Sequence, residues 1–449
     1  MARSRRPLLS KRSGLRPQPY VQTLLPFRVR SLRRDRLFRV AILASTAVVA
    51  CVATASSPAA RALLRTAPRE AAVRLERAVG VPPNRDEIDA IWSVRRARGV
   101  EVVEEKLAKF YRGTTPEMRR LFDVAGMAPG EGVVRWGFGD GAFVVSSRVF
   151  EPDEHGRAYR MRPNVRSIWL RQITLKDGLF GMFQVPDEPE TLAVAARAGA
   201  IPDLGSRQTT NSWGCRGPEP DPGAPIRGIV LGDSFMQGMF LDDAHTPSVL
   251  LERDLAAALG TKVSVLNTGH IGYSPEQYFH ALTAYYDRLR PNFAVVSVCP
   301  NDFGDGPTVM MGGGDWDEAE YWLDQIAQFC RTRGIACVLV PVPVEDELLG
   351  HRDHIEYPSR VPVVFDGGPT SYRSLTDAFT DEHLRLAIAA RSAGKFTSYS
   401  PLYNGQISDN HFSEAGSALW AKLIARRLAY LFEFRNEPMI DGAARSVAR

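Results

Sequence analysis

The second half of the chain alternates short apolar runs with longer amphipathic stretches. Nearly uninterrupted apolar runs predict strands buried on both faces, at 226–231, 263–266, 293–299 and 335–342. Helical spacing of apolar residues predicts helices at 246–259, 275–289, 316–331, 376–393 and 413–434. This alternation indicates an α/β fold with a parallel sheet covered by helices on both faces. Right-handed crossovers then bring the carboxyl end of every strand to the same edge.

The segments around this pattern divide the chain further. Residues 345–374 show no regular period and predict a loop over the same sheet edge. Residues 58–128 are rich in helical patterns and suggest a stalk or a small helical module, whereas 129–215 contain short strand-like runs between turns and predict a small β-rich module. The α/β domain then spans 216–436, and 437–449 form a tail.

The charge is distributed unevenly along the chain. Twelve of the 56 Lys and Arg residues and one of the 51 acidic residues lie between Met1 and Arg39, which leaves 44 bases and 50 acids for the rest. The main body is therefore mildly acidic despite a formal net charge of +5, and nucleic-acid binding is disfavoured. The basic residues 1–36 are predicted to form a cytoplasmic arm.

An apolar segment follows this arm. Residues 37–57 contain the uncharged run Val40–Ala55 and are long enough for a transmembrane signal anchor, which needs about 17–20 residues. The arginines before it favour a cytoplasmic N-terminus, a single pass through the cell membrane and an extracytoplasmic body. Two alternatives are signal cleavage within Ala53–Ala60 and a weak lipoprotein box at Val48–Cys51. All three put the body outside the cytoplasm.

The cysteines do not form a recognisable metal site. None of them belongs to a C-x-x-C pair: Cys51, Cys215, Cys299, Cys330 and Cys337. Cys330 and Cys337 flank a predicted helix-to-strand turn, where a disulfide is an alternative to two buried thiols. We expect buried thiols that behave as small apolar residues. No metal or cofactor is predicted.

Polar residues follow successive predicted strands. Ser234 ends a Gly-Asp-Ser turn after the first strand, Gly272 follows the second, Asn301 follows the third, and Asp409 and His411 precede the last helix. Taken singly, each has an ordinary explanation as a turn, cap or surface residue. Together they form the set that acyl transfer needs: a serine nucleophile, a histidine base and a carboxylate that orients it. Ser234 and Gly272 N–H groups and the Asn301 amide would stabilise the oxyanion.

These residues resemble the sequence blocks of the SGNH hydrolases, also called the GDSL esterase/lipase superfamily. The resemblance extends from about Asn211 to Phe434 and rests on Gly232–Ser234, Asn267–Gly272, Asn301-Asp302 and Asp409–His411. The lead-in Asn211–Gly217 (NSWGCRG) is similar to one found in many bacterial members. The resemblance implies a flavodoxin-like three-layer α/β/α sandwich, with Ser234, His411 and Asp409 as the triad and Ser234, Gly272 and Asn301 as the oxyanion hole.

Two positions depart from the family pattern. Pro300 replaces the usual glycine before Asn301, and the last block is Asp-x-His, with Ser408 at the usual position of the acid. The alternative to Asp409 is a Ser–His pair oriented by a backbone carbonyl. Elsewhere, His351 and His354 are expected in a polar loop rather than as metal ligands, and the acids at 242–243 are expected on a solvated loop.

The sequence thus predicts a membrane-anchored, extracytoplasmic serine ester hydrolase. Its expected substrate is a small-molecule or glycan ester, for instance an acetyl group on an envelope glycan. One alternative is an O-acyltransferase that uses the same triad. The other is a non-catalytic envelope module that binds a glycan or a protein partner.

Overall fold

The computed structural model describes 107–131, 135–136, 143–153, 157–172, 181–303, 316–349, 365, 370–395, 399–404 and 411–435. All of these residues belong to one compact unit, Ile88–Arg449. The predicted basic arm, signal anchor and tail lie outside them, as do Asp409, His351 and His354. Among the residues that the structure describes, no helix has the length and apolar character needed to cross a membrane.

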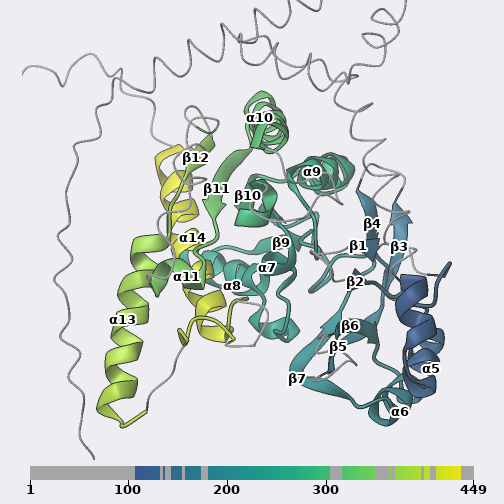
Figure 1. Cartoon of the computed structure of the whole chain (residues 1–449). Helices are drawn as coiled ribbons and strands as arrows, with labels where there is room; N and C mark the ends of the chain where they lie inside the picture. Colours follow the sequence, from purple (N-terminus) through teal and green to yellow (C-terminus); the bar gives the residue numbers. More distant parts are fainter. Residues whose placement is uncertain are drawn as a thin grey trace, which may run out of the picture. The chain divides into compact units, whose positions relative to one another are not determined.

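A five-stranded parallel sheet forms the centre of the α/β domain (Figure 1). Its strands are β8 (Ile226–Leu231), β9 (Val263–Asn267), β10 (Phe293–Val298), β11 (Ala336–Pro341) and β12 (Thr370–Tyr372). Their order is β12-β11-β10-β8-β9, and all four pairings are parallel. Numbered along the chain, this is the doubly wound order 2-1-3-4-5 of flavodoxin-like folds, with its switch point between β8 and β10. The predicted fold class is confirmed for this domain.

Alternate residues of the strands face two separate hydrophobic clusters. Ile229 and Leu231 of β8 join one cluster with α9 (Pro275–Leu289) and α10 (Trp316–Arg333). Val230 joins the other with α8 (Pro247–Leu259) and α14 (Glu414–Arg435). Because side chains alternate between the faces of a strand, these helix pairs cover opposite faces of the sheet. This burial on both faces explains why the strands read as continuous apolar runs.

Two expectations for the α/β domain are corrected or decided by the structure. The predicted loop 345–374 contains the short helix α11 (Glu345–Leu348) and edge strand β12, which adds to β11 before helix α13 (Thr376–Ser392). A three-residue edge strand held by backbone pairing leaves no apolar run to detect. Cys330 and Cys337 are free and buried, so the prediction of two buried thiols is confirmed; Cys215 and Cys299 are also free and buried.

The described residues before the α/β domain form short strands and helices, and residues 107–113 are helical. Their elements are α5 (Pro116–Val124), β1 (Arg135–Trp136), β2 (Phe143–Val144), β3 (Phe150–Asp153), β4 (Ala158–Met161), β5 (Arg166–Gln172), β6 (Gly181–Pro186), α6 (Pro189–Arg197) and β7 (Ala200–Thr209). They pair as two hairpins, β1-β2 and β3-β4, and a three-stranded antiparallel sheet ordered β6-β5-β7. Thr115 caps α5, and its hydroxyl accepts the Met118 N–H, as the Thr-Pro signal predicts.

These elements share a core with the α/β domain. Phe150, Tyr159 and Trp169 belong to the same hydrophobic cluster as Ile229 of β8. A third hydrophobic cluster, separate from the two that cover the parallel sheet, lies between α5, α6 and the β6-β5-β7 sheet. The predicted boundary at 215/216 stays a prediction, but side chains from both sides of it pack together.

Candidate active site

The serine at the end of β8 begins a single helical turn, α7 (Ser234–Gln237), near the centre of Figure 1. The Asp233 carboxylate caps this turn and accepts the Phe235 N–H at 3.0 Å. Ser234 Oγ lies 2.7 Å from Nε2 of His411, a residue 177 positions away. Both side chains are buried, with exposed fractions of 7% and 6%. The structure therefore brings the predicted nucleophile and base into direct contact.

The position of His411 is set by backbone pairing with residues 403–404 and by two aromatic rings. The Asn404 N–H donates to the His411 carbonyl at 2.9 Å, and the next residue, Phe412, pairs with Tyr403. The imidazole stacks on Phe235, with ring centroids 4.6 Å apart, and meets the edge of Phe240 at 6.0 Å. Because Phe235 follows the predicted nucleophile directly, α7 supplies both Ser234 and a ring that stacks on the predicted base.

The loop after β9 packs directly on α7. The Asn267 amide donates to the Met236 carbonyl at 2.8 Å, and its oxygen accepts the Gly269 N–H at 2.9 Å. A β-carbon on Gly269 would lie 2.6 Å from the Gln237 nitrogen, so glycine permits the close approach. Three residues later, Gly272 has φ +71°, a conformation that favours glycine. The predicted oxyanion loop therefore lies against the nucleophile turn.

A buried hydrogen-bond network links the turn after β10 to Asp233, the residue that caps α7. Asp302, in the 3₁₀ helix η2 (Pro300–Phe303), accepts the Cys299 N–H at 2.8 Å and the Tyr278 hydroxyl at 3.1 Å. The Cys299 thiol donates to Asp233 at 2.8 Å. Burial and the nearby Asp233 charge raise the pKa of the Asp302 carboxyl well above its usual range. This network fixes the backbone that carries Asn301. The side chain of Asn301 is not among the parts of the chain that the structure describes.

A buried arginine from the predicted lead-in holds the C-terminal end of α7. The Arg216 guanidinium donates to the carbonyls of Gln237, Gly238 and Leu241. Its Nε lies 3.0 Å from Asp243 Oδ1, and its side chain has no exposed surface. Asp243 was expected on a solvated loop; its side chain is 32% exposed, and its carboxylate also balances the buried charge of Arg216.

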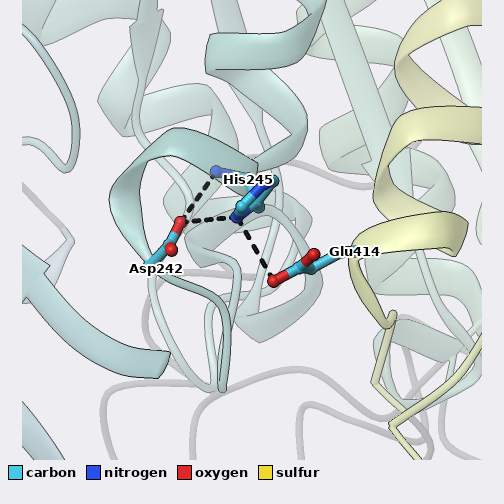
Figure 2. A group of neighbouring side chains, drawn as sticks. All are labelled: Asp242, His245 and Glu414. Carbon is cyan, nitrogen blue, oxygen red and sulfur yellow. Dashed lines mark hydrogen bonds and ion pairs between the residues drawn. The ribbon is translucent and has the colours of Figure 1, made fainter. Parts of the chain in front are cut away.

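Asp242, also expected on a solvated loop, belongs to a separate cluster with His245 and Glu414 (Figure 2). Asp242 caps the 3₁₀ helix η1 (Asp243–His245) and lies 2.8 Å from His245 Nδ1, and Glu414 lies 3.4 Å from the same nitrogen. Their ligand atoms all lie within 4.8 Å of one another. The Asp242 cap and the ion pairs account for this arrangement, which joins η1 to the start of α14 just after His411.

His270, two residues before Gly272, is a buried histidine with two backbone partners. Its Nε2 accepts the Met161 N–H at 3.1 Å, so the proton is on Nδ1, which donates to the Thr268 carbonyl at 3.0 Å. Burial lowers its pKa to about 4, although the Thr268 carbonyl and Asp153 favour the charged form. Protonation of Nε2 would remove the acceptor for Met161.

We expect the titration of His270 to make the free energy of unfolding depend on pH. Its pKa is lower in the folded chain than in the unfolded chain, so the unfolded state takes up a proton first as pH falls. The free energy of unfolding should therefore drop by about 2 kcal/mol between about pH 7.5 and pH 5 through this group. Urea titrations of wild type and His270→Gln measure it, with His383→Gln as control. An equal loss in wild type and His270→Gln would contradict the assignment.

The structure describes the positions of only some of the predicted site residues, whose catalytic roles stay predictions. Ser234 and His411 meet, and the Gly272 loop lies against α7. The Asp409 and Asn301 assignments stay predictions. Sequence reasoning did not detect the roles of Arg216, Asp302 or Cys299. Arg216 lay in a lead-in singled out by resemblance alone, and its role depends on three carbonyls that carry no side-chain signal.

The chain was compared with known proteins. No protein-family model matches the sequence, and no curated protein does either. Among solved structures it is similar to a lipase/acylhydrolase from Enterococcus faecalis, with 18% identity, coverage of 46% of this chain and 96% of that one, and a TM-score of 0.33. It is also similar to an acetyl xylan esterase (17% identity, 45% and 98% coverage, TM-score 0.33) and to a psychrotrophic esterase from Pseudoalteromonas sp. (13%, 47% and 99%, 0.33).

Proposed function

We propose that the chain is a serine ester hydrolase. The observation that carries the proposal is the 2.7 Å contact between Ser234 Oγ and His411 Nε2 at the carboxyl edge of a parallel sheet. A serine hydroxyl is a weak nucleophile until a base accepts its proton, and a histidine nitrogen at hydrogen-bond distance is that base. The surrounding network that fixes α7 and the Gly272 loop supports a preorganised site rather than a chance contact.

The reaction follows from these positions. Ser234 Oγ attacks the ester carbonyl carbon while His411 Nε2 takes its proton. The bond to the alcohol oxygen then breaks, and His411 returns the proton to the leaving alcohol. Water attacks the acyl-serine with His411 again as base, the acyl–serine bond breaks, and Ser234 recovers its proton.

The remaining roles come from the sequence. Asp409 orients His411, and the N–H groups of Ser234 and Gly272 with the Asn301 amide stabilise the oxyanion. Loss of one such donor typically costs about 2.7–4 kcal/mol of barrier. Residues 37–57 anchor the chain with its catalytic domain outside the cytoplasm, and the substrate is a small acyl ester such as an acetylated envelope glycan.

A fluorophosphonate probe and two esters test this proposal. The probe should label wild type at Ser234 and leave Ser234→Ala unlabelled. p-Nitrophenyl acetate should be hydrolysed faster than a long-chain ester, and Ser234→Ala should fall to the buffer rate. A membrane-impermeant form of the probe should label intact cells if the site is extracytoplasmic. Equal labelling and turnover in wild type and Ser234→Ala would overturn the hydrolase proposal.

A further inference from the structure

A tyrosine from outside the α/β domain contacts the oxyanion loop. Tyr159 lies on β4, in the hairpin formed by β3 and β4, and its side chain is fully buried. Its hydroxyl donates to the Ile271 carbonyl, 112 residues away in sequence. The β3-β4 hairpin therefore reaches the backbone immediately before Gly272.

This contact bears on the direction of the Gly272 N–H. The Ile271 carbonyl and the Gly272 N–H belong to one peptide group, which is planar and trans. In such a group the C=O and the N–H point in opposite directions. A hydroxyl that holds the Ile271 oxygen therefore also sets where the Gly272 hydrogen points.

The preceding peptide is held independently. The Ile271 N–H donates to the Gln237 side-chain oxygen at 2.6 Å. Gln237 is the last residue of α7, and its amide nitrogen donates to Gln184 at 3.1 Å and lies 3.0 Å from the side-chain amide of Gln208. Both backbone polar groups of Ile271 are thus tied, one to the nucleophile helix and one to the hairpin.

Further contacts join the hairpin to the same loop. The Tyr273 hydroxyl donates to the Tyr159 carbonyl, and the Met161 N–H donates to His270 at 3.1 Å. The rings of His270 and Tyr273 stack with centroids 4.7 Å apart. The loop is therefore held on both sides of the Ile271–Gly272 peptide.

An external restraint is needed here because the residue is glycine. Glycine accepts both signs of φ with little steric penalty, so the peptide before Gly272 can rotate more easily than one before a bulkier residue. A donor that points away in part of the population gives less stabilisation to the developing charge.

We propose that Tyr159 is a positioning residue that orients the Gly272 N–H towards the oxyanion. The inference rests on the proposed hydrolase function. It gives the β3-β4 hairpin a part in catalysis, which the sequence did not assign to any residue before Ser234.

Tyr159→Phe in the full-length chain tests this role. The ring stays and the hydroxyl is lost, so we expect kcat for p-nitrophenyl acetate to fall by about 10- to 100-fold, less than the loss of a whole oxyanion donor, with KM nearly unchanged. The reaction rate with a fluorophosphonate should fall in parallel. Tyr285→Phe is the matched control, because its buried hydroxyl donates to the Trp213 carbonyl at 3.1 Å and not to the Ile271 carbonyl.

A readout independent of turnover separates this inference from the proposed function. In ¹⁵N-glycine-labelled protein, the Gly272 amide resonance should shift in Tyr159→Phe and stay in place in Tyr285→Phe. Wild-type kcat and an unmoved Gly272 resonance in Tyr159→Phe would overturn the inference, whatever the stability change. Failure of Ser234-dependent turnover in wild type would overturn the proposed function, and the resonance would still decide whether Tyr159 orients the peptide.

Discussion

Replacement of His411 by alanine should lower kcat for ester hydrolysis by about 10⁴-fold or more, with a much smaller change in KM. His411 Nε2 lies 2.7 Å from Ser234 Oγ, whereas the Asp233 carboxylate accepts from the same hydroxyl only at 3.5 Å. The substrate is bound by other parts of the site, so binding should largely survive. Steady-state kinetics with p-nitrophenyl acetate measure both constants. His383→Ala is the control, because that histidine contacts Ser400 on a different part of the domain.

The double variant Ser234→Ala/His411→Ala sharpens this test. If the two residues act as one unit, the double variant should lose about as much as either single variant, because the second replacement removes nothing that still functions. Losses that multiply would show that Ser234 and His411 contribute independently. That result would contradict a nucleophile–base pair.

The parallel sheet was predictable because its strands are buried on both faces. β8 to β11 carry apolar side chains towards both hydrophobic clusters, so each reads as an apolar run of the right length. β12 was missed because Thr370–Tyr372 has no such run and is defined by its pairing with β11. Local pattern therefore identified β8 to β11, including the edge strand β9, whereas tertiary pairing defined the other edge strand, β12.

The candidate site also has a part that was predictable from the sequence and a part that was not. Ser234 and His411 were predictable because each stands at the boundary of a strongly patterned element, where the topology of a doubly wound sheet gathers residues. The contacts that fix them are long-range and mostly made to backbone atoms. The Tyr159 hydroxyl and the Arg216 guanidinium bind carbonyl groups, which every residue has. The residues that supply these carbonyl groups therefore carry no sequence feature that marks them as partners of Tyr159 or Arg216.

Replacement of Arg216 by methionine should lower the free energy of unfolding by about 3–5 kcal/mol, because each buried carbonyl group that loses its donor costs about 1–3 kcal/mol. The variant loses the donors to Gln237, Gly238 and Leu241 and leaves Asp243 without its buried cation. Chemical denaturation measures the stability change. Arg207→Met is the matched control, because that arginine is 63% exposed and pairs with Asp187, so its loss should cost less than about 1 kcal/mol.

The Arg216→Met variant should also lose activity. Arg216 holds the C-terminal end of α7, and Ser234 is the first residue of that helix. At temperatures where Arg216→Met remains folded, we expect kcat to fall while KM changes little, since the loosened turn presents the nucleophile in the reactive position less often. Arg216→Lys keeps the charge but replaces a planar fork by a point donor, so it should recover part of the stability and less of the rate. A lysine variant with both fully restored would show that α7 needs the buried charge but not the fork.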